Sequence, residues 1–104
     1  MPRNKYSTLT EQMFYVLLAL KEECHGMDIM RKVDMLTEGR IAIGPGTLYN
    51  LLEQFMSSGY IRETSAEGRK KNYILTESGS ELLKAEVKRI IQQIQDYSKV
   101  FEEE

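Results

Sequence analysis

Residues 77–101 carry an apolar stripe that constrains the whole chain. The apolar positions are spaced by four, three, four, three and four residues: Leu83, Val87, Ile90, Ile94, Tyr97 and Phe101. This is the a and d spacing of a heptad repeat, and such a stripe requires a partner surface. It either packs on its own domain or on a second copy. Because the other segments already suffice for a compact unit, we expect these residues to form a homodimer interface.

Length and composition indicate an ordinary globular protein. The chain has 104 residues with 41% hydrophobic and 29% charged side chains, which fits one small domain. A core of this size is modest, so a dimer would add stability. The longest apolar run, residues 13–20, is too short to cross a membrane. The N-terminus lacks the apolar core of a secretory signal, so we expect a cytoplasmic protein with no membrane partner.

Catalytic and metal-binding residue patterns are missing from the sequence. There is one cysteine, Cys24, and one histidine, His25, which excludes an internal disulfide and a thiol cluster for zinc. We interpret Cys24 as a small apolar residue near a helix end and His25 as a helix-end or surface residue. No nucleophile–base pair, phosphate loop or carboxylate cluster suggests an enzyme. We therefore expect no cofactor, no metal and no catalytic residue.

The first 43 residues show two helical periods. Thr8 and Glu11 have the spacing of a capping box, which predicts a helix over about residues 9–23. The step His25-Gly26 interrupts it, and a second helix is predicted over residues 27–37, ending at Gly39. The following residues, 40–43, are short, apolar and rich in β-branched side chains, and could form one short strand.

The next segment predicts a third helix with two different faces. Leu48, Leu51, Leu52 and Phe55 recur at helical spacing and form an apolar face. The other face carries small and hydrogen-bonding residues, among them Gly46, Thr47, Asn50 and Gln54. Asn and Gln can pair with an adenine edge, and Thr can meet a thymine methyl or a phosphate. A recognition helix reads bases through its N-terminal part, so we predict DNA contacts by these residues.

The helix opens with Gly44-Pro45-Gly46, which has two interpretations. Proline fits the first turn of a helix, where its missing N–H costs little. Glycines on either side could let a DNA phosphate approach the free N–H groups of the helix start. Alternatively, the three residues form a tight turn and nothing more. The sequence leaves both interpretations open.

A basic β-hairpin is predicted after this helix. Residues 60–64 and 70–75 are β-branched and aromatic, and residues 65–69 have turn composition. Arg69, Lys70 and Lys71 are consecutive, and we predict that they contact phosphates. Five positive and three negative side chains lie in residues 40–73, a net charge of +2, whereas four positive and seven negative ones from residue 77 onward give −3. The acidic balance of the chain thus lies in its last helix.

The order of these elements predicts a mainly α fold with a small β-hairpin. Helices joined by a short connection and followed by a hairpin are typical of a winged helix-turn-helix. We assign residues 1–76 to this DNA-binding domain and residues 77–104 to a long C-terminal dimerisation helix that Thr76 caps.

Several motifs resemble the PadR-like family of bacterial transcriptional regulators. They are His25-Gly26, Gly46-Thr47-Leu48-Tyr49, Leu52, Gly59-Tyr60-Ile61, Tyr73 and Leu75-Thr76-Glu77-Ser78-Gly79. One departure is Phe55-Met56, where a Leu-Glu pair is common. The resemblance implies a homodimer that binds double-stranded operator DNA, usually to repress, with Tyr49 near the DNA backbone.

The resemblance also implies a small-molecule inducer in some members, bound in a cavity between the two copies. Here Met13, Ile90, Ile94 and Tyr97 would line it, and the absence of tryptophan excludes a ligand held between two indoles. A stripe of this kind is more often core than ligand site. The alternative function is a winged-helix module that binds protein and not DNA, which the net charge of −2 would suit.

Overall fold

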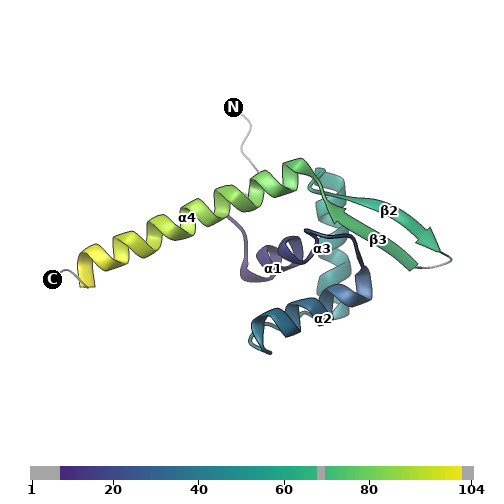
Figure 1. The fold of residues 1–104 in the computed structure, drawn as a ribbon, viewed down its shortest axis with the longest axis horizontal. Helices are drawn as coiled ribbons and strands as arrows, with labels where there is room; N and C mark the ends of the chain where they lie inside the picture. The colour runs from purple at the N-terminus through teal and green to yellow at the C-terminus, as the bar shows by residue number, and fades with distance from the viewer. Residues whose placement is uncertain (1–7, 68–69, 102–104) are drawn as a thin grey trace.

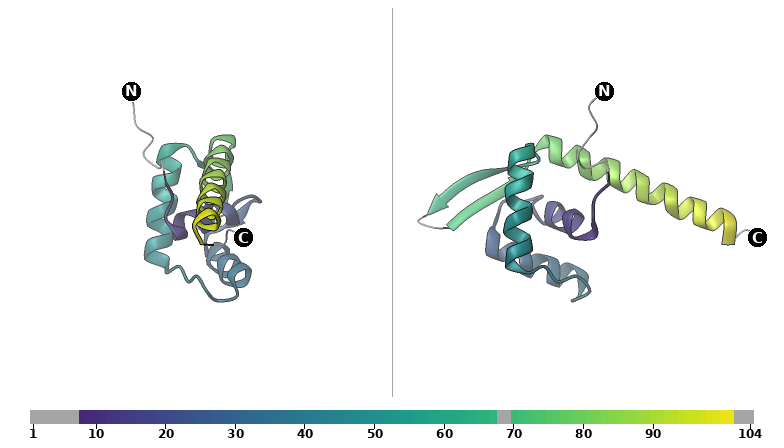
Figure 2. Two further views of the ribbon diagram at one scale, coloured as in Figure 1. Left: turned by 90° about the vertical axis from the view of Figure 1, so that its left-hand side faces the viewer. Right: turned by 180° about the vertical axis from the view of Figure 1, so that it is seen from behind.

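The computed structural model describes residues 8–67 and 70–101, which form four helices and a three-stranded sheet (Figure 1). In chain order these are α1 (Glu11–Ala19), β1 (Cys24–His25), α2 (Gly26–Thr37), α3 (Pro45–Ser58), β2 (Ile61–Glu67), β3 (Lys70–Leu75) and α4 (Glu77–Phe101). The predicted winged helix-turn-helix with a long C-terminal helix is confirmed. The β2–β3 hairpin and the C-terminal half of α4 project in opposite directions from the body (Figures 1 and 2).

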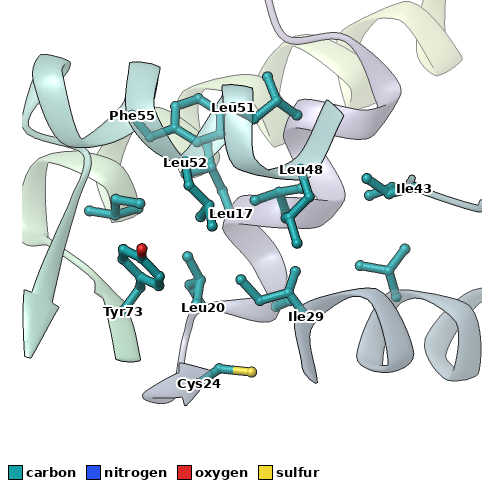
Figure 3. Close-up of a cluster of buried hydrophobic side chains, with 14 of the residues drawn as sticks. Leu17, Leu20, Cys24, Ile29, Ile43, Leu48, Leu51, Leu52, Phe55 and Tyr73 are labelled. Carbon is teal, nitrogen blue, oxygen red and sulfur yellow. The ribbon is translucent and has the colours of Figure 1, made fainter. Parts of the chain in front are cut away.

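The hydrophobic core lies between α1, α2, α3 and the base of the sheet (Figure 3). The largest fully buried apolar side chains come from all three helices: Val16, Leu17, Leu20, Ile29, Val33, Leu48, Leu52 and Phe55. Burying one such side chain contributes roughly 1.5–3 kcal/mol. The apolar face predicted for α3 is therefore its core face, and the opposite face of α3 is left outside.

The sheet has strand order β1-β3-β2, with both neighbouring pairs antiparallel. The strand β1 was not predicted, because two residues cannot show a β period. It forms through tertiary contacts: Leu75 donates its N–H to the Leu20 carbonyl at 2.9 Å, and Cys24 then pairs with Tyr73. Cys24 is a small buried residue near a helix end as predicted, since it directly precedes the N-cap of α2, and it also belongs to the strand β1.

Two predicted boundaries near the N-terminus are wrong. The N-cap of α1 is Thr10, whose hydroxyl accepts the Met13 N–H at 3.1 Å, so Thr8 and Glu11 do not form a capping box. The helix ends at Ala19 rather than Glu23, since the chain turns there to reach β3. Either threonine is a good N-cap by type, and packing decides between them.

The predicted short strand over residues 40–43 is also wrong. This segment pairs with no strand of the described chain and connects α2 to α3. Its β-branched residues alternate, with Ile41 and Ile43 buried and Ala42 exposed. The Ile41 N–H donates to the Thr37 hydroxyl at 3.1 Å. The apolar pattern is thus explained by the burial of Ile41 and Ile43 in the core, with no pairing to a neighbouring strand of the described chain.

The start of α4 is joined to the end of α3 by a tight cluster of hydrogen bonds. The Thr76 hydroxyl donates to the Gly59 carbonyl at 2.7 Å and accepts the Gly79 N–H at 3.1 Å. The Thr76 N–H donates to the Tyr60 carbonyl at 3.0 Å. A Cβ on Gly79 would lie 2.1 Å from that carbonyl oxygen, so only glycine permits this approach.

Farther along α4, a buried carboxylate holds the segment before α1. Glu86 is 5% exposed and accepts the Leu9 N–H at 3.4 Å. Arg89 donates its Nε–H to the same carboxylate at 3.1 Å and forms an ion pair with it. The hydrogen bond and charge of Arg89 hold the pKa of Glu86 below its usual value. The first half of α4 therefore belongs to the body of the protein.

Beyond Glu86, α4 leaves the body with its apolar stripe exposed (Figure 2). The predicted interface residue Leu83 is only 9% exposed and lies in the chain's own core. The remaining positions of the stripe are exposed, from 36% at Ile90 to 72% at Phe101, and Ile91 and Val100 widen it. No helix within residues 8–67 and 70–101 has the length and apolarity to span a membrane.

Replacing Gly79 by alanine tests the α3–α4 junction. Alanine is the better helix former, yet Gly79→Ala should lower the free energy of unfolding by about 1–3 kcal/mol because Cβ meets backbone. Urea unfolding followed by circular dichroism measures this. Gly46→Ala is the matched control, because a Cβ there meets nothing within 4 Å. Equal stability of the two variants would contradict the packing described here.

Candidate nucleic-acid interface

The first turn of α3 is open to the outside. Gly44 is the N-cap and provides no side-chain cap, Pro45 is the first helical residue, and the first intrahelical bond runs from the Leu48 N–H to the Gly44 carbonyl at 2.9 Å. The N–H groups of Gly46 and Thr47 precede that bond and lack an acceptor within the helix. A Cβ on Gly44 or Gly46 would meet nothing within 4 Å.

Neither glycine is required by the conformation of the chain. Gly44 has φ −78°, and among the described residues the glycines with positive φ are Gly39 and Gly59. Gly46 lies in the helix with open space where its side chain would be. Neither backbone geometry nor packing within the described chain therefore requires that Gly44 and Gly46 lack side chains.

The outward face of α3 matches the sequence prediction. Gly46, Thr47 and Asn50 are exposed next to this open turn, and Gln54 is partly buried one turn farther on. The structure thus brings Gly46, Thr47 and Asn50 together on one surface, with Gln54 at its end.

Tyr49 lies between this surface and the start of α2. Its side chain is 42% exposed, and its ring packs over Gly26. A Cβ on Gly26 would lie 3.0 Å from the Tyr49 hydroxyl oxygen and 3.2 Å from Cε1. Gly26 therefore positions Tyr49 by leaving room for its ring. The sequence pointed to Gly26 through the His25-Gly26 motif, but it did not predict the contact of Gly26 with Tyr49.

The two described lysines of the hairpin face different sides of it. Lys71 lines a groove with Tyr49, Leu52 and Tyr73, so it faces α3. Lys70 lies on the other face, in a cavity that Asp28 and Asn72 also line. Alternation along a strand places neighbouring side chains on opposite faces. Arg69, the third predicted phosphate contact, lies outside the described residues.

His25 is a helix-end residue as predicted, but its position at the edge of both hollows was not predicted. Its Nδ1 accepts the Met27 N–H at 3.1 Å and so caps α2. The ring lines the cavity of Lys70 and also the hollow that contains Tyr49 and Lys71. With Nδ1 accepting, a neutral ring carries its proton on Nε2, which is then a hydrogen-bond donor.

The groove of Lys71 has mixed charge, because Glu53 and Glu63 also line it. Burial raises the pKa of the Tyr73 hydroxyl, and the Glu63 charge raises it further, so this phenol stays neutral. Burial likewise raises the pKa of the Cys24 thiol. Within the described residues no three His, Cys, Asp or Glu side chains gather as metal ligands. The surface carries hydrogen-bonding side chains, with the positive charges of Lys70 and Lys71 on the two faces of the hairpin.

A family comparison decides what kind of protein carries this surface. Residues 16–85, about two thirds of the chain, match the model of the transcriptional regulator PadR-like family. The chain belongs to this family. Its members are transcriptional regulators and not enzymes. The matched region runs from α1 into the first part of α4 and includes the whole candidate interface.

Individual proteins agree with this assignment. The transcriptional regulator YqjI of Escherichia coli is 30% identical over 63 residues, which are 61% of this chain but only 30% of that protein. A PadR family regulator from Eggerthella lenta has a similar structure, with a TM-score of 0.70 and 22% identity over 89% of this chain and 83% of its own. RosR of H. salinarum gives a TM-score of 0.72 and 20% identity over 86% and 80%. These two structures show a shared fold.

The contact between Gly26 and Tyr49 predicts a local effect in this PadR-like regulator. Gly26→Ala should displace the Tyr49 ring by a few tenths of an ångström, because the hydroxyl and Cε1 are within 3.0–3.2 Å of the new Cβ. The ring-proton chemical shifts of Tyr49 report this displacement. Gly44→Ala, which adds a methyl group in open space, should leave them unchanged. Unaltered Tyr49 signals in Gly26→Ala would refute the contact.

Proposed function

We propose that this PadR-like regulator is a dimeric repressor that binds double-stranded operator DNA through the start of α3 and the β2–β3 hairpin. The observation that carries the proposal is the open first turn of α3. Its glycines are required by nothing inside the described chain, and its first N–H groups receive no side-chain cap. A phosphate at this helix start would account for both features.

Base contacts would come from the exposed face next to that turn. Thr47 and Asn50 would enter the major groove with α3, and Gln54 would extend the contact. Tyr49 would direct its hydroxyl to the DNA backbone from its position over Gly26. The hairpin would supply phosphate contacts through Lys71 on the α3 side and Lys70 on the other face. Arg69, which precedes Lys70 in the sequence, would add a third.

The exposed stripe of α4 would form the dimer interface. The helix has left the body at Val87, Ile90, Ile94, Tyr97 and Phe101, which are all exposed. The rings of Tyr97 and Phe101 lie in tilted contact, with their centroids 5.1 Å apart. Covering them with the same stripe of a second copy removes them from water. Leu83, the first residue of the predicted stripe, would pack in the core of its own copy and not in the dimer interface. The same surfaces, with Met13, would line the site of a small apolar or aromatic inducer.

A module that binds protein and not DNA is the alternative function, favoured by the net charge of −2. Charge reversal separates the two. Lys70→Glu combined with Lys71→Glu should abolish DNA binding under the proposed function. A wild-type protein that binds no duplex at low salt would favour the alternative.

Two substitutions separate base reading from phosphate binding. Asn50→Ala should weaken binding to the preferred duplex by roughly 1–3 kcal/mol and leave random DNA nearly unaffected. Lys71→Ala should weaken both alike and reduce the slope of log K against log salt by about one. Fluorescence anisotropy at several salt concentrations measures both. Wild-type behaviour of both variants would show that the assigned surface is wrong.

A charge placed in the stripe tests the dimer. Ile94→Glu should convert the dimer to monomers, because each copy would place a charged carboxylate in an apolar seam. Sedimentation equilibrium measures the mass. Gln95→Glu adds the same charge at the next position, outside the stripe, and should stay dimeric. An Ile94→Glu protein that remains dimeric would contradict the α4 interface.

A further inference from the structure

The β2–β3 hairpin has an irregularity between its base and its tip. Glu63 pairs with Tyr73, and Ser65 pairs with Asn72, so Thr64 is an extra residue of β2 without a partner in β3. A bulge of this kind bends the strands and increases their twist. On one side of it, Ile61 and Tyr73 are fixed in the core, and on the other side lies Lys70. The bulge therefore governs the direction of the hairpin tip.

The carboxylate of Glu23 is located at this bulge. Its Oε2 accepts the Thr64 hydroxyl at 2.6 Å and the Asn72 side-chain amide at 3.1 Å. The same amide nitrogen also lies 3.2 Å from the Ser65 hydroxyl oxygen. One oxygen thus binds both strands of the hairpin at the position where they bend. The hydrogen bond from Thr64, followed by that from Asn72, lowers the pKa of the Glu23 carboxyl.

Glu23 itself is held by the body of the protein. It lies between Leu20, whose carbonyl accepts the Leu75 N–H at 2.9 Å, and Cys24, which pairs with Tyr73. The side chain is exposed, so it adds no core packing. The two strands are already paired through their own ladder. What the Glu23 contacts add is a link between the body and the bent part of the hairpin.

We propose that Glu23 is a positioning residue for DNA binding, which fixes the direction of the hairpin and thereby the places of Lys70 and Lys71 relative to α3. This role rests on the proposed function, in which those lysines bind phosphate. It deepens that function by assigning an acidic residue to a basic surface. Glu23 acts through Thr64 and Asn72, which donate to its carboxylate, and Asn72 also donates to Ser65.

The sign of the effect distinguishes positioning from simple charge. Removing a carboxylate from a DNA-binding protein reduces repulsion of phosphates and should strengthen binding, most at low salt. A positioning role predicts weaker binding after the same change. Glu22→Ala is the matched control, since Glu22 carries the same charge but lines the groove between α1 and α2.

The first experiment uses the free protein and no DNA. Amide hydrogen exchange and ¹⁵N relaxation are measured for residues 62–65 and 70–73 in wild type, Glu23→Ala, Glu23→Gln and Glu22→Ala. Glu23→Ala should increase exchange and motion in the hairpin with little change in the thermal midpoint. Glu23→Gln keeps an oxygen acceptor and should behave as wild type, as should Glu22→Ala. A hairpin unchanged in Glu23→Ala would overturn the inference, whatever the protein binds.

The second experiment measures binding to a duplex selected from a random pool. Glu23→Ala should weaken binding by about three- to tenfold, the loss expected from roughly one hydrogen bond's contribution, and Glu23→Gln should restore it. In a Lys70→Ala, Lys71→Ala background, Glu23→Ala should have no further effect. Tighter binding by Glu23→Ala, or an equal loss without the lysines, would overturn the positioning role. Failure of the wild type to bind any duplex would instead refute the proposed function.

Discussion

The rest of the structure depends on the junction between the end of α3 and the start of α4. One hydroxyl, that of Thr76, donates to the Gly59 carbonyl and accepts the Gly79 N–H, and the missing Cβ at Gly79 lets the helix approach the Tyr60 carbonyl. This contact fixes the direction in which α4 leaves the body. In the proposed dimer, α4 joins the two copies and α3 reads DNA, so the junction would set the distance between the two reading surfaces.

Those parts of the fold that are encoded locally could be predicted from the sequence. The limits of α3 and α4 follow from long uninterrupted periods with Pro45 at one start and Gly59 at one end. The strand β1 could not be predicted, because two residues carry no period and the strand exists only through its pairing with β3. The strand predicted over residues 40–43 is wrong for the opposite reason, because its local pattern is that of a strand but its tertiary pairing is missing from the described chain. Their β-branched side chains are buried without any neighbouring strand.

The candidate site also has one part that local sequence predicts and another part that depends on tertiary packing. Helical geometry alone predicts that Gly46, Thr47 and Asn50 share the face opposite the core. Strand alternation alone places Lys70 and Lys71 on opposite faces, but which of them faces α3 depends on the register of the hairpin. The contact of Tyr49 with Gly26 requires the packing of α3 on α2. The heptad pattern includes Leu83, which lies in the chain's own core because the first turns of α4 still cover the body. The dimer contacts of the other positions stay a prediction.

The most direct test of the account is a chemical-shift map of the protein during titration with a selected DNA duplex. The account predicts that the backbone amides of Gly46, Thr47 and Asn50 and those of Lys70 and Lys71 shift together, while amides beyond Ile94 in α4 stay in place. Shifts confined to α4, or no shifts with a duplex in excess at low salt, would contradict DNA binding by the start of α3 and the hairpin.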